Sequence, residues 1–101
     1  MSVRKDLLVG RWMHSHEEDA PGRQAYRPAT FHFPPSRGRA GFHLHADGSL
    51  TEIGIGANDT PDERAGRWTV DGDTLVLEPA GEPERRLPIV ALAADKLITQ
   101  R

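Results

Sequence analysis

The chain has 101 residues, of which 37% are hydrophobic and 28% charged, a composition that fits one rather polar folded domain and leaves little room for a second. Its net charge of −2 gives neither sign a dominant field, which argues against nucleic acid and against an anionic membrane as partners. The sequence has no cysteine, so disulfides, thiolate metal sites and cysteine nucleophiles are excluded. We therefore treat residues 1–101 as a single domain.

The amino-terminal segment is polar up to residue 6 and continues with a short apolar run, Leu7 to Val9. Such a run is far too short for the apolar region of a signal peptide or for a membrane-spanning helix. We expect residues 1–6 to be loose or to form one helical turn. We also expect the protein to be cytoplasmic and to have no membrane partner.

Short strand-like segments joined by turns fill the rest of the chain. Apolar and polar residues alternate strictly over residues 41–46, and the Asp47-Gly48 pair that follows is a strong hairpin signal. Asp71-Gly72 is a second tight turn, and the polar segment 56–64 is expected to be a loop. The predicted strands are 9–16, 26–33, 41–46, 49–55, 67–70, 74–78, 85–92 and 96–101.

About eight short strands with antiparallel turns are typical of a barrel or a sandwich. We predict an all-β fold, an eight-stranded antiparallel up-and-down barrel, because a closed barrel leaves no exposed strand edge in a chain without disulfides. Eight strands enclose enough space for side chains or for one small ligand. The alternative is an open β-sandwich, which would have no lumen.

Four segments, in order, carry a resemblance to a known family. "LLVGRW" places Gly10 and Trp12 in a Gly-x-Trp pattern, and "GFHLHADGSL", "GRWTVDGDTLVL" and "ADKLITQR" follow it. Over residues 7–101 the chain resembles the lipocalin-like, or calycin, barrels, in particular small bacterial members of unassigned function. The resemblance implies a lipocalin-like barrel with Trp12 at its base and an arginine of the last strand, Arg101 here, stacked on that ring. The chain is shorter than true lipocalins, which implies a smaller cavity.

The five histidines all fall in the first half of the chain, and two of them alternate on one predicted strand. In "GFHLHA", Phe42 and Leu44 take the interior positions, so His43 and His45 are predicted to face outward.

His14 and His16 share the phase of Trp12 and are predicted to face inward. Two histidine pairs from different strands offer a donor set that zinc or copper accepts. Because the two pairs are expected to face opposite ways, we predict no metal site and no cofactor.

The barrel interior is therefore the predicted site, and its function is predicted to be the non-enzymatic binding of a small, partly apolar molecule. Two tryptophans would form apolar walls or plugs, and three polar side chains would orient the ligand. We accordingly expect tryptophan fluorescence to respond to the ligand. The predicted lumen residues are Trp12, His14, His16, Tyr26 and Trp68.

The loop "PPSRGRAG" carries a weaker candidate for the rim of the barrel. Arg37 and Arg39 flank a glycine, and two guanidinium groups so placed can grip a carboxylate or phosphate. The simpler interpretation is a solvated connection between two strands.

Two other functions remain open at this point. A barrel with a filled core would act as a protein-interaction or homo-oligomerisation module, as a monomer or homodimer, whereas an interior cavity of at least a few hundred Å³ would favour ligand binding. An enzyme ranks third and is not predicted. None of the serines lies in a nucleophile-elbow context, and no His–Asp pair stands out in the sequence.

Overall fold

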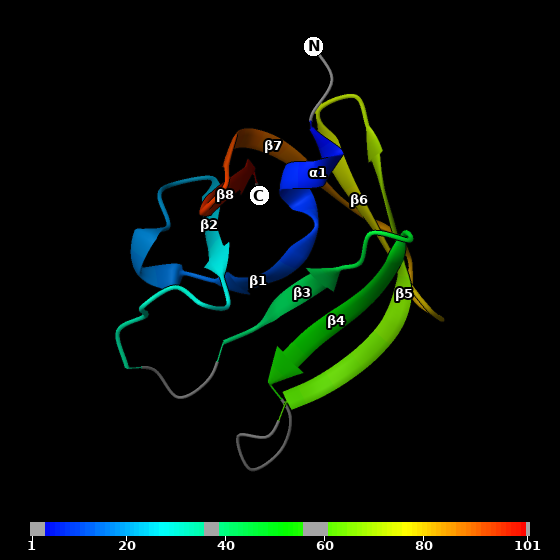
Figure 1. Ribbon diagram of the computed structural model, residues 1–101, viewed down its shortest axis with the longest axis horizontal. Helices are drawn as coiled ribbons and strands as arrows, with labels where there is room; N and C mark the ends of the chain where they lie inside the picture. The colour runs from blue at the N-terminus through cyan, green and yellow to red at the C-terminus, as the bar shows by residue number, and fades with distance from the viewer. Residues whose placement is uncertain (1–3, 36–38, 56–60, 101) are drawn as a thin grey trace.

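The computed structural model describes residues 4–35, 39–55 and 61–100, which form one barrel with a short helix at its start (Figure 1). The elements, in chain order, are α1 (Lys5–Leu8), β1 (Gly10–His14), the 3₁₀ turn η1 (His16–Glu18), β2 (Arg23–Pro28), β3 (Gly41–Leu44), β4 (Ser49–Ile55), β5 (Pro61–Asp71), β6 (Thr74–Pro79), β7 (Arg85–Ala93) and β8 (Lys96–Gln100).

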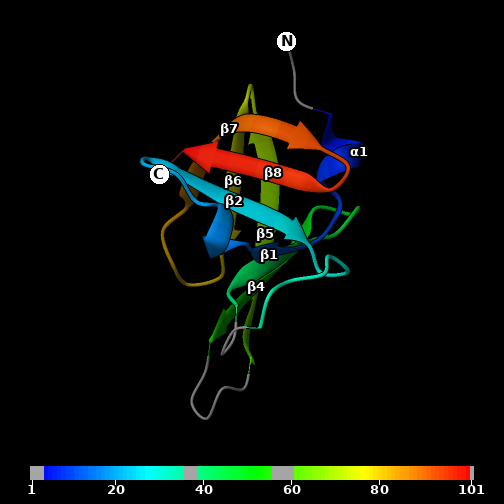
Figure 2. The ribbon, with the colours of Figure 1, turned by 90° about the vertical axis from the view of Figure 1, so that its left-hand side faces the viewer.

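The strands hydrogen-bond in one closed antiparallel ring, in the order β1-β2-β8-β7-β6-β5-β4-β3. This closure confirms the predicted eight-stranded antiparallel barrel and rules out the open sandwich. The order departs from a strict up-and-down meander at one place. β1 pairs with both β2 and β3, and β2 closes the ring against β8, so that β2, β8 and β7 lie side by side (Figure 2).

The predicted hairpin turns are confirmed. Gly48 follows the β3 strand with φ +91°, and its amide donates to the carbonyl oxygen of His45 at 3.0 Å. Gly72 connects β5 to β6 with φ +61°. Both angles lie in the left-handed region, where a side chain is unfavourable, so glycine at these turns sets where β4 and β6 begin.

The first strand ends earlier than predicted. The prediction extended it to His16, whereas β1 stops at His14 and His16 begins η1. The Ser15 hydroxyl donates to Oε2 of Glu18 at 2.7 Å, and the Glu18 amide donates to the Ser15 carbonyl oxygen at 2.9 Å. These local bonds compete with sheet pairing and turn the chain out of the barrel wall.

The second strand also differs from its prediction. We expected residues 26–33, but β2 runs from Arg23 to Pro28. It starts early because Arg23 and Gln24 pair with β8. It ends at Pro28, which has no amide hydrogen for a sheet bond, and the Phe31 amide then donates back to the Pro28 carbonyl oxygen at 2.8 Å.

Strand β5 is much longer than the predicted 67–70, because the predicted loop 56–64 already joins the sheet at Pro61. Its first half is polar and offers no apolar alternation. The pairing partner β4 supplies the hydrogen-bonding groups instead, with Glu63 opposite Ile53 and Arg64 opposite Glu52. A polar segment that becomes a strand only because it pairs with a neighbouring strand cannot be recognised from its own sequence pattern.

The core occupies one end of the barrel, which α1 covers. Leu8 of α1 is fully buried, and its carbonyl oxygen accepts a 2.8 Å hydrogen bond from Nε1 of Trp12. The buried cluster is Leu8, Trp12, Tyr26, Phe42, Leu44, Leu50, Trp68, Leu75, Leu77, Leu87 and Leu97.

None of the helices in the described residues is long and apolar enough to cross a bilayer.

Candidate binding pocket at one end of the barrel

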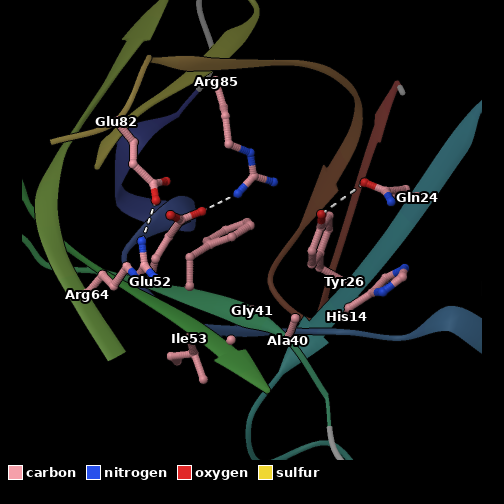
Figure 3. Close-up of a pocket in the computed structure, with 12 residues that line it drawn as sticks. His14, Gln24, Tyr26, Ala40, Gly41, Glu52, Ile53, Arg64, Glu82 and Arg85 are labelled. Carbon is pink, nitrogen blue, oxygen red and sulfur yellow. Dashed lines mark hydrogen bonds and ion pairs between the residues drawn. The ribbon is translucent and has the colours of Figure 1, made fainter. Parts of the chain in front are cut away.

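The end of the barrel away from α1, which we call the pocket end, holds a pocket of about 420 Å³ (Figure 3). β1 runs from Gly10 beside α1 to His14 at the pocket end. Its antiparallel neighbours β2 and β3 therefore run from the pocket end toward α1. Glu52 is in phase with the core residue Leu50, and Arg85 is in phase with Leu87. The pocket is therefore lined in part by the inward faces that form the core, at their other end. Ile53 and Glu82 also line it but do not lie on those faces.

One side of the pocket is aromatic. Tyr26, His14 and Phe42 come from β2, β1 and β3, which are adjacent strands of the ring. The Tyr26 and Phe42 ring centroids are 5.0 Å apart, and those of His14 and Tyr26 are 5.5 Å apart. The Tyr26 hydroxyl donates to Oε1 of Gln24 at 3.2 Å. This side offers flat apolar surfaces with a few hydrogen-bonding groups at their edge.

The other side of the pocket carries four charges in two ion pairs. Arg85 of β7 donates to the carboxylate of Glu52 on β4, and Arg64 of β5 donates to the carboxylate of Glu82 in the β6–β7 connection (Figure 3). β4 and β7 are not neighbours in the ring, so the Arg85–Glu52 pair crosses the barrel. The two sides together present apolar surface and paired charges to the same small volume.

His14 is held in place by Asp19. Its Nε2 lies 3.1 and 2.9 Å from the two carboxylate oxygens of Asp19, and one of these oxygens also accepts the Ala25 amide at 2.9 Å. A carboxylate only accepts hydrogen bonds, so Nε2 is the donor in this pair. The imidazole of His14 is thus directed away from the charged side of the pocket (Figure 3).

The structure brings together only some of the predicted lumen residues. His14 and Tyr26 line the pocket, whereas Trp12 and Trp68 are buried in the core nearer to α1. Trp68 donates from Nε1 to the His45 carbonyl oxygen at 2.8 Å. Neither indole lines this pocket, and the expected fluorescence response to a ligand remains a prediction.

His16 does not line the pocket, in contrast to the predicted inward orientation. Its side chain is 53% exposed, and Nε2 lies 3.6 Å from Oε2 of Glu17. The prediction required the strand to continue through His16, and the strand ends at His14. The change from strand to η1 removes the alternation on which the prediction was based.

Arg39 does not offer a free cation at the rim. Its guanidinium donates to both carboxylate oxygens of Glu17, at 2.8 and 2.6 Å, and lies 4.4 Å from the centre of the Phe33 ring. The side chain is only 8% exposed, and the hydrogen bond from Arg39 lowers the pKa of Glu17 to about 2. Arg39 therefore anchors the loop to η1. Arg37 and Arg101 lie outside the described residues.

The outward histidine pair is confirmed. His43 and His45 stack with ring centroids 4.0 Å apart, and Nε2 of His45 lies 3.1 Å from Oγ1 of Thr51. Burial, and secondarily the neighbouring His45, lowers the pKa of His43. Across the described ranges, no three His, Asp or Glu side chains are grouped so as to hold a metal ion.

Sequence reasoning missed the charged side of the pocket. The available signal was strand phase: Glu52 and Arg85 each stand two positions from a core leucine on the same face. An inward phase combined with a charged side chain indicates a polar end of a barrel. Arg64 carried no such signal, because it fell in the segment predicted as a loop, and Glu82 lies in a turn.

Comparison of the chain with protein-family models, with curated proteins and with solved structures finds no match. The strand pairing alone identifies the fold, and the pocket is the feature from which a function can be inferred.

Proposed function

We propose that this barrel binds a small molecule, carrying both an apolar part and a charged or polar group, in the pocket opposite α1, and that it does so without catalysis. The observation that carries this proposal is the pocket itself, which has a volume of about 420 Å³ and is lined largely by inward-facing side chains. That volume falls within the range of roughly 300–1,000 Å³ typical of small-molecule sites.

The chemistry of the lining supports binding through charges that are already paired. None of the described residues that line the pocket is a serine, threonine, cysteine or lysine. The nearby Ser15 hydroxyl is buried and donates to Glu18. The charges of the pocket are already arranged in ion pairs, which suits recognition of a ligand charge by exchange of partners.

A lipocalin-like identity is part of the same proposal. The Gly-x-Trp pattern supports it, because Gly10 has φ +141° where β1 begins and Trp12 is buried at the end that α1 covers. The position of β2 between β1 and β8 is a departure from the meander order that the resemblance implies. The closed barrel and the buried Trp12 are the basis for proposing the lipocalin-like family. The bacterial origin is proposed from the sequence resemblance alone.

A pocket-blocking variant tests the binding function. Ala40 is exposed, lines the pocket and shares the inward phase of Phe42, so Ala40→Trp places an indole in the pocket without disturbing the core. Ala65 is a matched control, since it is also exposed, its carbonyl oxygen likewise accepts one amide hydrogen bond, and its phase on β5 is outward. A library of small molecules is screened by amide chemical shifts against both variants and the parent chain.

We expect hits that shift pocket amides in the parent chain and in Ala65→Trp, and that lose this effect in Ala40→Trp. Hits that bind Ala40→Trp as well as the parent would show that the pocket is not the binding site. A library without a single hit at this end of the barrel would remove the proposal.

A further inference from the structure

We infer that the pocket selects a small organic amine, whose ammonium group binds the carboxylate of Glu52 while its apolar part lies against the rings of Tyr26 and Phe42. This inference rests on the proposed function and names the chemical class of its ligand.

Glu52 is the stationary charge of the pocket. It lies within β4, paired on one side with Phe42 of β3 and on the other with Arg64 of β5, and its side chain is only 15% exposed. A carboxylate so enclosed is costly to leave without a cationic partner. Any ligand that enters must therefore leave Glu52 paired with a positive charge.

Arg85 is the movable charge. It reaches Glu52 from across the barrel, at the first residue of β7, and its side chain is 49% exposed (Figure 3). A half-exposed guanidinium on a long side chain is readily hydrated when it swings outward. The chain's own guanidinium thus occupies the position that a ligand cation would take.

The low exposure of Glu52 and the higher exposure of Arg85 decide the sign of the ligand charge. An entering ammonium replaces Arg85 on Glu52, and only the guanidinium moves into water. An entering carboxylate would instead take Arg85 and leave Glu52 unpaired in its enclosed position. Arg64, the other nearby cation, is bonded to Glu82, so the transfer of Arg64 to Glu52 would break a second ion pair.

The aromatic side suits the rest of an amine. Phe42 is the direct cross-strand neighbour of Glu52, and its ring lies 5.0 Å from that of Tyr26. The face of an aromatic ring can pack against an apolar group and can also attract a nearby ammonium group through a cation–π interaction. A carboxylate beside two rings is therefore a receptor for an arylalkyl or alkyl amine.

Three probes of nearly equal size separate the charge from the apolar part. Phenethylamine is cationic, phenylpropionate is anionic and phenethyl alcohol is neutral at neutral pH. Each is titrated against the full chain, and binding is followed by the chemical shifts of the pocket amides. We expect phenethylamine to bind at least about tenfold more tightly than phenylpropionate.

Two variants test the roles of the two charges. In Glu52→Gln the affinity for phenethylamine falls at least about tenfold, because a charge-assisted hydrogen bond is lost. In Arg85→Met the same affinity rises by about threefold or more, because the competing cation is gone. A structural defect would not tighten binding. Glu78→Gln, which removes an exposed carboxylate from the outer face of β6, is the control and leaves the affinity unchanged.

The outcomes separate this inference from the proposed function. Tighter binding of phenylpropionate, with a loss in Arg85→Met, would overturn the amine and keep the binding pocket. Equal binding of all three probes, abolished by Ala40→Trp, would also overturn the amine and keep the pocket. If no probe shifts the pocket amides while other library members do, the amine fails alone; if nothing in the library does, both proposals fail.

Discussion

Glu18 joins three elements through its carboxylate. It accepts hydrogen bonds from Ser15 at 2.7 Å and from Nε and Nη2 of Arg27 at 2.9 and 2.8 Å, and Nζ of Lys96 lies 3.3 Å away. Arg27, as the largest cause, lowers the pKa of Glu18 from 4.5 to about 2. Arg27 is on β2 and Lys96 is on β8, the two strands that close the ring, so this carboxylate connects η1 to both of them.

The stability of the protein should consequently fall in acid. The pKa of Glu18 is about 2 in the folded chain and near 4.5 when unfolded, so its contribution is complete above about pH 4.5 and is lost as the pH falls toward 2. Glu18→Gln removes this carboxylate, and its free energy of unfolding declines less steeply over that interval. Urea unfolding at a series of pH values measures the difference.

Arg27→Met is the matched variant for this prediction, because it keeps the carboxylate and removes the main cause of its lowered pKa. We expect its acid dependence to resemble that of Glu18→Gln. A profile parallel to that of the parent chain would show that the ion pair does not cause the acid sensitivity.

Individual side-chain directions were predictable wherever a strand alternates regularly. Phe42 and Leu44 face inward and His43 faces outward, as their alternation indicates. The Arg85–Glu52 pair was not predictable, because its members lie on strands that meet only across the closed barrel.

At the scale of the elements, the contact of β1 with β3 depends on a glycine. A Cβ built on Gly41 would lie 2.1 Å from the Trp12 carbonyl oxygen and 3.0 Å from Cα of Met13. We expect Gly41→Ala to lower the free energy of unfolding by about 1–3 kcal/mol, the usual cost of overpacking. Denaturant unfolding measures it, with Gly72→Asn as control.

Gly72 has φ +61° and open space around its Cβ position, and asparagine tolerates that conformation. Gly72→Asn should therefore be nearly neutral. Equal losses in the two variants would contradict the close approach of the two strands. Turn glycines of this kind made the start of β4 predictable, but the start of β5 at Pro61 depends on pairing with β4, which no local signal reports.

The whole molecule divides into an end that stabilises the fold and an end that holds the pocket. Leu8 is fully buried in the core under α1, whereas Arg85 is half-exposed in a pocket ion pair. We expect Leu8→Ala to cost about 2–5 kcal/mol of unfolding free energy. Arg85→Met leaves the enclosed carboxylate of Glu52 without its partner and should cost about 1–3 kcal/mol, less than the core truncation. Thermal and denaturant unfolding, followed by tryptophan fluorescence, measure both.

Val9→Ala is the control at the first end, since Val9 adjoins Leu8 and is exposed, and it should change stability by about 0.5 kcal/mol or less. Because Trp12 and Trp68 lie in the core, their fluorescence reports unfolding. A large loss in Arg85→Met would mean that the pocket charges hold the barrel closed. A small loss of unfolding free energy would mean that the pocket side chains can be substituted without loss of the barrel, because the core alone holds the fold.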